Sequence, residues 1–127
     1  MNLLLDTHVI LWIASDTEKL SAKAKSAITD ENNVRYVSIA SSWEVAIKLG
    51  TQKLQFDGGV SEFYRVIDTN DFYETGVSRK YLDLLCSLED FHRDPFDRLI
   101  IATALAEDFT IITADDNIHK YNINWLW

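Results

Sequence analysis

Short apolar runs alternate with amphipathic helical patterns along the whole chain, and this alternation restricts the fold more than any other feature. Apolar and β-branched runs predict strands at Asn2–Leu5, Val34–Ser38, Phe72–Val77, Thr110–Thr113 and Asn122–Trp127. When strands and helices alternate, right-handed crossovers place the strands side by side in a mostly parallel sheet. The sequence therefore predicts an α/β fold whose sheet is covered by helices on both faces.

Helices are predicted between these strands, at Thr7–Ala14, Ser21–Glu31, Ser41–Gly50, Ser61–Asn70, Arg79–Leu88 and Asp94–Asp108. The last has the strongest signal, because Asp94 stands at the N-cap and Pro95 at the first helical position, where its missing N–H costs no hydrogen bond. With 127 residues, of which 47% are hydrophobic, the chain has the size of one domain and can bury a sizeable core. We therefore expect residues 1–127 to form a single domain.

The charge balance is acidic, with 12 basic and 20 acidic residues and a net charge of −8. Proteins that bind nucleic acids usually present a basic face. Either the partner is not a nucleic acid, or part of the negative charge is gathered in a site that binds cations. The positions of the acidic residues decide between these two interpretations.

The single cysteine and the N-terminal segment indicate the cellular setting. Cys86 cannot form a disulfide within the chain, and its apolar neighbours predict a small buried side chain. The segment MNLLLDTHVILW carries no basic leader and is too short to cross a membrane. We expect a cytoplasmic protein that does not associate with a membrane.

Four carboxylates from distant parts of the chain are predicted to lie at one edge of the sheet. Asp6 follows the first strand, and Asp115 follows the fourth. Asp97 lies in the first turn of the last predicted helix, and Glu44 in the first turn of the third. The carboxyl ends of parallel strands form the edge at which open α/β sheets bind their ligands.

Three of these carboxylates also have a local explanation. Asp6 would cap the first helix, and Asp97 would lie favourably at the positive end of its helix dipole. Asp115 and the adjacent Asp116 would serve as turn residues. For each of the three, the local and the functional interpretations both stay open when the residue is considered alone.

Glu44 has two local explanations, a capping box with Ser41 and a surface ion pair with Lys48. The four carboxylates considered together favour a shared site, because converging carboxylates repel one another and need a counter-charge. A divalent cation supplies that charge. Oxygen ligands without cysteine suit Mg²⁺ or Mn²⁺.

Four segments together resemble the motifs of PIN-domain proteins, and more narrowly those of the VapC-type toxins of bacterial toxin–antitoxin pairs. In chain order they are LLLDTHVILW, SIASSWEVAIKLG, HRDPFDRLIIATA and TIITADD. The third segment is the most specific of them. The resemblance spans nearly the whole chain.

The resemblance implies a three-layer α/β/α fold with a central parallel sheet, and an endoribonuclease that depends on Mg²⁺ or Mn²⁺. It also implies an RNA substrate, a cognate VapB-type antitoxin and a homodimer. Asp94 and Asp116 are nearby acids; Asp116 would replace its neighbour as a ligand if the last loop is shifted by one residue. The acidic residues of the family fall on Asp6, Glu44, Asp97 and Asp115.

Several neighbouring side chains are candidates to assist hydrolysis by a metal-activated water. Thr7 and Thr113 would each add a hydroxyl, unless they bond only to local backbone. Arg98 would hold an RNA phosphate, with solvated surface charge as the alternative. His92 would contact substrate or orient a neighbour, with a structural histidine as the alternative.

A groove for a helix of the antitoxin is a further expectation, since apolar residues recur in two neighbouring predicted helices. Ordinary core packing accounts for most of these residues. They are Trp43, Val45, Ile47, Phe63 and Val66.

Three other functions compete with a toxin ribonuclease. A non-catalytic PIN-like module that binds protein or RNA would not need the four acids, and a structure-specific DNA nuclease would use the same chemistry. A receiver-type signalling domain would need an acidic pair after the first strand and a phosphorylatable aspartate after a middle strand. Asp6 instead stands alone, and Ile39 and Ala40 follow the second strand.

Overall fold

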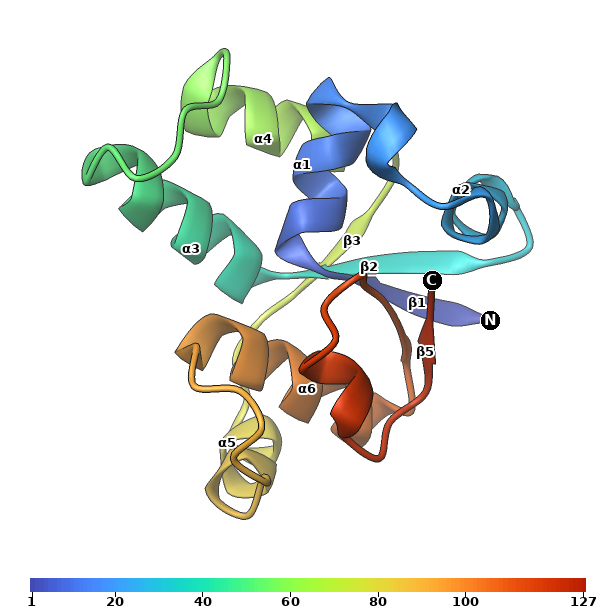
Figure 1. The fold of residues 1–127 in the computed structure, drawn as a ribbon, viewed down its shortest axis with the longest axis vertical. Helices are drawn as coiled ribbons and strands as arrows, with labels where there is room; N and C mark the ends of the chain where they lie inside the picture. The colour runs from blue at the N-terminus through green and yellow to red at the C-terminus, as the bar shows by residue number, and fades with distance from the viewer.

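The computed structural model describes residues 1–127, which form a five-stranded sheet in the order β3-β2-β1-β4-β5 (Figure 1). All four strand pairings are parallel, so the carboxyl ends of the strands lie at one edge. The prediction of a mostly parallel α/β sheet is confirmed. The strands are β1 (Asn2–Leu5), β2 (Val34–Ser38), β3 (Tyr73–Thr75), β4 (Thr110–Ile112) and β5 (Trp125–Leu126).

Helices cover both faces of the sheet and complete three layers. Figure 1 shows α1, α2 and α4 on one side of the sheet and α5 and α6 on the other. None of the helices is both long enough and apolar enough to span a membrane. The helices are α1 (Thr7–Ser15), α2 (Ala22–Thr29), α3 (Ile39–Gly50), α4 (Gly59–Thr69), α5 (Arg79–Cys86) and α6 (Pro95–Glu107), with 3₁₀ turns η1 (Thr17–Lys19) and η2 (Ile118–Lys120).

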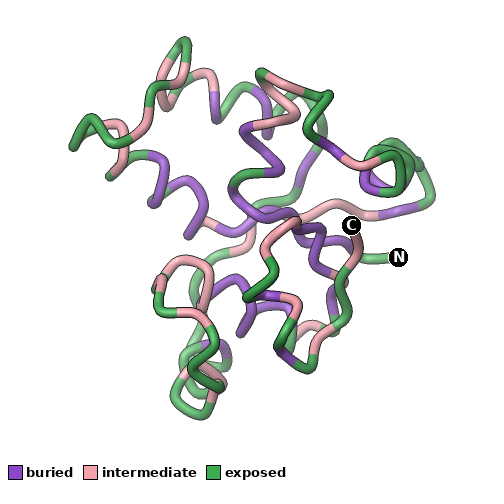
Figure 2. The backbone as a smooth tube through the Cα atoms, viewed as in Figure 1, coloured by how far each residue is buried: buried purple, intermediate pink, exposed green.

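Alternation along β1 divides the core between the two faces. Leu3 and Leu5 pack with α1 and α4, whereas Leu4 packs with α6 on the opposite face. All three leucines are fully buried, and each contributes roughly 1.5–3 kcal/mol to stability. Figure 2 shows buried positions along the central strands and the inner stretches of α1 and α6. The sheet therefore gives the residues at its carboxyl edge a rigid base.

The N-terminus of α6 forms as the sequence predicts. The Asp94 side chain accepts hydrogen bonds from the backbone N–H groups of Phe96 at 2.8 Å and Asp97 at 3.3 Å, and Pro95 occupies the first turn. This cap orients the first turn of α6, which carries Asp97 at the edge of the sheet.

The predicted start of α3 is wrong. The helix begins at Ile39, because the Ser38 side chain accepts a hydrogen bond from the backbone N–H of Ala40 and caps the helix there. Ser41 therefore lies inside the helix, and Glu44 lies in the second turn instead of the first. The capping box between these two residues is not formed.

One prediction of burial is also wrong. Cys86 is exposed, because α5 buries only Tyr81 and leaves its C-terminal end in solvent. Of the five apolar residues considered for an antitoxin groove, three belong to the core, as the core-packing interpretation predicted for most of them, and Trp43 and Ile47 remain exposed. The three core residues are Val45, Phe63 and Val66.

Candidate metal centre

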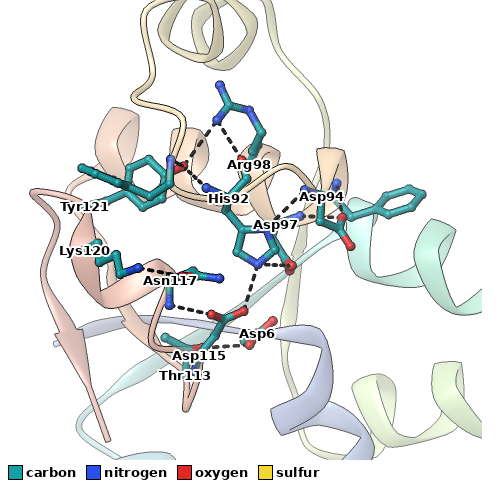
Figure 3. Close-up of polar contacts among 12 residues, drawn as sticks. Asp6, His92, Asp94, Asp97, Arg98, Thr113, Asp115, Asn117, Lys120 and Tyr121 are labelled. Carbon is teal, nitrogen blue, oxygen red and sulfur yellow. Dashed lines mark hydrogen bonds and ion pairs between the residues drawn. The ribbon is translucent and has the colours of Figure 1, made fainter.

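The fold brings the four predicted carboxylates toward the carboxyl edge of the sheet. Asp6 follows β1, Asp115 follows β4, Asp97 lies in the first turn of α6, and Glu44 lies on α3. Figure 3 shows Asp6, Asp97 and Asp115 gathered around the ring of His92. Segments far apart in the sequence therefore supply one acidic site.

His92 lies at the centre of this site. The sequence analysis did not establish this central position. Its Nε2 atom is 3.0 Å from Oδ2 of Asp97 and 2.9 Å from Oδ2 of Asp115. Its Nδ1 atom accepts a hydrogen bond from the backbone N–H of Asp94 at 3.2 Å. A neutral imidazole that accepts at Nδ1 carries its proton at Nε2, so the ring donates toward the two carboxylates.

Asp6 is a buried carboxylate that directly follows β1. Its Oδ2 atom accepts a hydrogen bond from the Thr113 hydroxyl at 2.8 Å, while its buried Oδ1 atom has no partner. Its side chain does not cap α1, so the local explanation is not supported. Burial raises the pKa of Asp6 above its ordinary value.

Glu44 is a second buried acid with a free oxygen. Its side chain is 3% exposed, and Oε2 accepts a hydrogen bond from Nζ of Lys48 at 2.6 Å. The predicted ion pair exists, but its acidic end is buried instead of lying on the surface. Oε1 of Glu44 has no partner. The hydrogen bond to Glu44 raises the pKa of Lys48, so the lysine holds its charge firmly.

The electrostatics of Asp97 and Asp115 differ sharply. Burial, followed by repulsion from Asp6 and other nearby carboxylates, raises the pKa of Asp97 to about 8. Burial also acts to raise the pKa of Asp115, but hydrogen bonds from His92 and the Asn117 backbone outweigh it and leave that pKa below its ordinary value. The site thus concentrates negative charge, and Asp97 and Asp6, whose pKa values are both raised, can relieve it by taking up a proton.

The chemistry of these side chains fits a divalent cation. Two buried carboxylate oxygens, on Asp6 and Glu44, have no hydrogen-bond partner, and a cation would supply one. Ligand atoms of His92, Asp97 and Asp115 all lie within 4.8 Å of one another. Carboxylate oxygens are ligands that Mg²⁺ and Mn²⁺ prefer.

The auxiliary residues divide between those that face the site and those that do not. Thr113 supports it twice, since its hydroxyl donates to Asp6 and accepts from the backbone N–H of Asp115 at 3.0 Å. The Thr7 hydroxyl instead donates to the Ser41 hydroxyl at 2.8 Å. The side chain of Asp116 is 99% exposed, so Asp115 is the acid that faces the site.

The expectation that Arg98 holds a phosphate is not supported by its contacts. Its guanidinium donates to Tyr121 and to three main-chain carbonyl groups of the loop before α6, and its side chain is only 18% exposed. A guanidinium engaged in this way stabilises a loop and has few donors left for a substrate. The three carbonyl groups belong to Leu88, Glu89 and His92.

Comparison with known proteins identifies the family. The PIN domain model matches residues 3–124, and the chain belongs to the PIN domain family. The resemblance predicted from the four sequence motifs is therefore confirmed, and membership in this family excludes a receiver-type signalling domain.

Within the family, the chain is similar to a VapC ribonuclease in sequence and to VapBC structures in fold. The chain is 27% identical over 120 residues to Ribonuclease VapC22 of Mycobacterium tuberculosis, covering 93% of this chain and 90% of the relative. The structure of VapBC2 from Rickettsia felis, bound to a DNA fragment from its promoter, matches with a TM-score of 0.73 at 15% identity, covering 100% of this chain and 99% of that chain. VapBC-1 of Haemophilus influenzae matches with a TM-score of 0.68 at 15% identity, covering 99% and 97%. These structures share the α/β/α fold.

Proposed function

We propose that this chain is a metal-dependent endoribonuclease that acts as the toxin of a toxin–antitoxin pair and hydrolyses RNA phosphodiester bonds. The observation that carries the proposal is the cluster of four acids at the sheet edge, two of which hold buried oxygens without partners. Family membership and the likeness to a VapC ribonuclease support it. In this proposal residues 1–127 form a single nuclease domain, and the protein acts in the cytoplasm.

The acids would hold Mg²⁺ or Mn²⁺ through Asp6, Asp97 and Asp115, with Glu44 completing the shell. When bound, such an ion lowers the pKa of its water ligand and offsets the charge of the phosphate. The chain's own contribution is to keep the oxygens in place: Thr113 holds Asp6, and Lys48 holds Glu44. The net charge of −8 is consistent with this function because bound divalent cations would offset the charge of the four acids of the site.

The partner in this proposal is a VapB-type antitoxin, and the structural relatives are VapBC complexes. Trp43 is 58% exposed and packs edge-on against Phe96, with a centroid distance of 5.0 Å. With the exposed Ile47, it gives an apolar surface on α3 for a partner helix. Co-purification with the product of the adjacent gene tests this partner. Light scattering on the purified toxin tests the homodimer that the resemblance implies.

Cleavage assays on the partner-free protein test the nuclease function. With Mg²⁺ or Mn²⁺ we expect internal cuts in single-stranded RNA, and with a chelator we expect no cutting. Re-addition of either ion should restore the cuts, because the carboxylates bind the metal reversibly. Single-stranded DNA of the same sequence serves as the matched control substrate.

Three results of this assay would contradict the proposal. RNA cleavage that persists in chelator would show that the reaction does not depend on a metal ion. RNA binding without any cleavage would indicate a non-catalytic module. Preferential cleavage of branched or flapped DNA would indicate a structure-specific DNA nuclease.

A further inference from the structure

The hydroxyl of Tyr121 is the hub of a hydrogen-bond network beside the acidic site (Figure 3). It accepts hydrogen bonds from the backbone N–H of Phe91 at 3.1 Å and from that of His92 at 2.9 Å. It donates to the carbonyl oxygen of Glu89 at 2.8 Å. One phenol therefore satisfies three main-chain groups of the loop that links α5 to α6.

Arg98 holds the same loop through further hydrogen bonds. Its Nη1 atom donates to the carbonyl oxygens of Glu89 at 2.9 Å and His92 at 3.0 Å, and lies 3.3 Å from the Tyr121 hydroxyl. Arg98 lies on α6, and Tyr121, which follows η2, is 5% exposed and packs in the core with residues of α6 and β4. The loop is thus fastened to the rigid part of the molecule.

The loop matters because it carries His92 into the acidic site. With the main chain of His92 held by Tyr121, and Nδ1 of its ring held by the Asp94 backbone, the imidazole has one nitrogen left to face the site. That nitrogen, Nε2, bridges Asp97 and Asp115. Tyr121 also follows the turn that carries Asp115, so it joins the His92 loop to the segment that supplies Asp115.

We propose that Tyr121 is a positioning residue of this site, whose hydroxyl fixes the His92 loop so that the imidazole bridges Asp97 and Asp115. Without the hydroxyl, two N–H groups of the loop lose their acceptor and the loop gains freedom. The His92 ring then samples other orientations, and the distance between the Asp97 and Asp115 carboxylates becomes more variable. The catalytic consequence rests on the proposed nuclease function, whereas the structural consequence does not.

The variant Tyr121→Phe tests this proposal, with Tyr81→Phe as its matched control. Tyr81 is a buried tyrosine that also loses one hydroxyl contact, its 3.0 Å hydrogen bond to Glu107, but it lies on α5 away from the site. We expect Tyr121→Phe to lower kcat roughly 10–100-fold, the range for loss of a partner that orients metal ligands, with KM nearly unchanged. Tyr81→Phe should leave both parameters at the wild-type level.

Nitrogen NMR of the metal-free protein gives a readout that does not depend on catalysis. In the wild type, His92 should show a protonated Nε2 and an unprotonated Nδ1 when the ring is neutral. In Tyr121→Phe the two nitrogen signals should move toward each other as the ring averages between tautomers. Tyr81→Phe should retain the wild-type pattern.

Three outcomes would overturn the positioning role. They are a wild-type His92 protonated at Nδ1, an unchanged His92 spectrum in folded Tyr121→Phe, or an equal kinetic loss in both variants. If Tyr121→Phe does not fold, a wild-type His92 protonated at Nδ1 still overturns the proposal. If the wild type cuts no RNA, the nuclease proposal fails, while the NMR measurement tests the positioning of His92 independently.

Discussion

Asp97→Asn should reduce RNA cleavage by at least about a hundredfold, because even partners outside the ligand shell typically cost 10–100-fold. The substitution keeps the size of the side chain and removes its charge. Asp97 lies at the first turn of a firmly capped helix, so the fold should survive. The loss should appear mainly in kcat, since the carboxylate serves the reacting group instead of binding distant parts of the RNA.

The control for this experiment is Asp83→Asn. Asp83 is an exposed aspartate on α5 that forms no ion pair, so the same chemical change there should leave the rate unchanged. Wild-type cutting by Asp97→Asn in Mg²⁺ or Mn²⁺ would refute the assignment of Asp97. Circular dichroism of both variants establishes that any loss of activity does not come from unfolding.

The same substitution should make the metal-free protein more stable at high pH. Because burial and repulsion raise the pKa of Asp97 from 3.8 to about 8, the folded chain binds this proton more tightly than the unfolded chain. The stabilisation is therefore fully present below pH 3.8 and is lost as the pH rises through 8. Asn cannot ionise, so the variant escapes the loss.

Thermal unfolding in chelator measures the effect. At pH 8 we expect Asp97→Asn to melt roughly 5 °C or more above the wild type, and at pH 4 the two Tm values should nearly coincide. Mn²⁺ at pH 8 should raise the wild-type Tm and close the gap, because it replaces the missing counter-charge. A Tm difference that is constant across this pH range, or an equal response of both proteins to Mn²⁺, would contradict the electrostatic account.

The fold was predictable because the central strands have a clear local sequence signal, whereas that of β3 is weak. Apolar runs such as Leu3–Leu5 and Ile111–Ile112 have no other stable place than a covered sheet, and the parallel order follows from the alternating helices. The positions of Asp6 and Asp97 follow from the same logic, since one ends a strand and the other follows a strong helix cap. Local signals therefore sufficed for the edge of the sheet.

The remaining features depend on tertiary contacts that no local pattern contains. Two serines of one segment, Ser38 and Ser41, are both suitable caps; Ser38 caps α3, whereas the Ser41 hydroxyl accepts a hydrogen bond from Thr7. His92 lies in a loop without periodicity, and its central place depends on long-range hydrogen bonds, such as the one from its backbone N–H to the Tyr121 hydroxyl. The signal available was its position two residues before the cap at Asp94.

The central claim is that distant acids share one divalent cation, and diffraction from crystals soaked in Mn²⁺ tests it most directly. The account predicts an anomalous peak within coordination distance of Asp6, Asp97 and Asp115 in the wild type, and its loss in Asp97→Asn. A wild-type map with no peak among these carboxylates, at Mn²⁺ concentrations that support cleavage, would contradict the account.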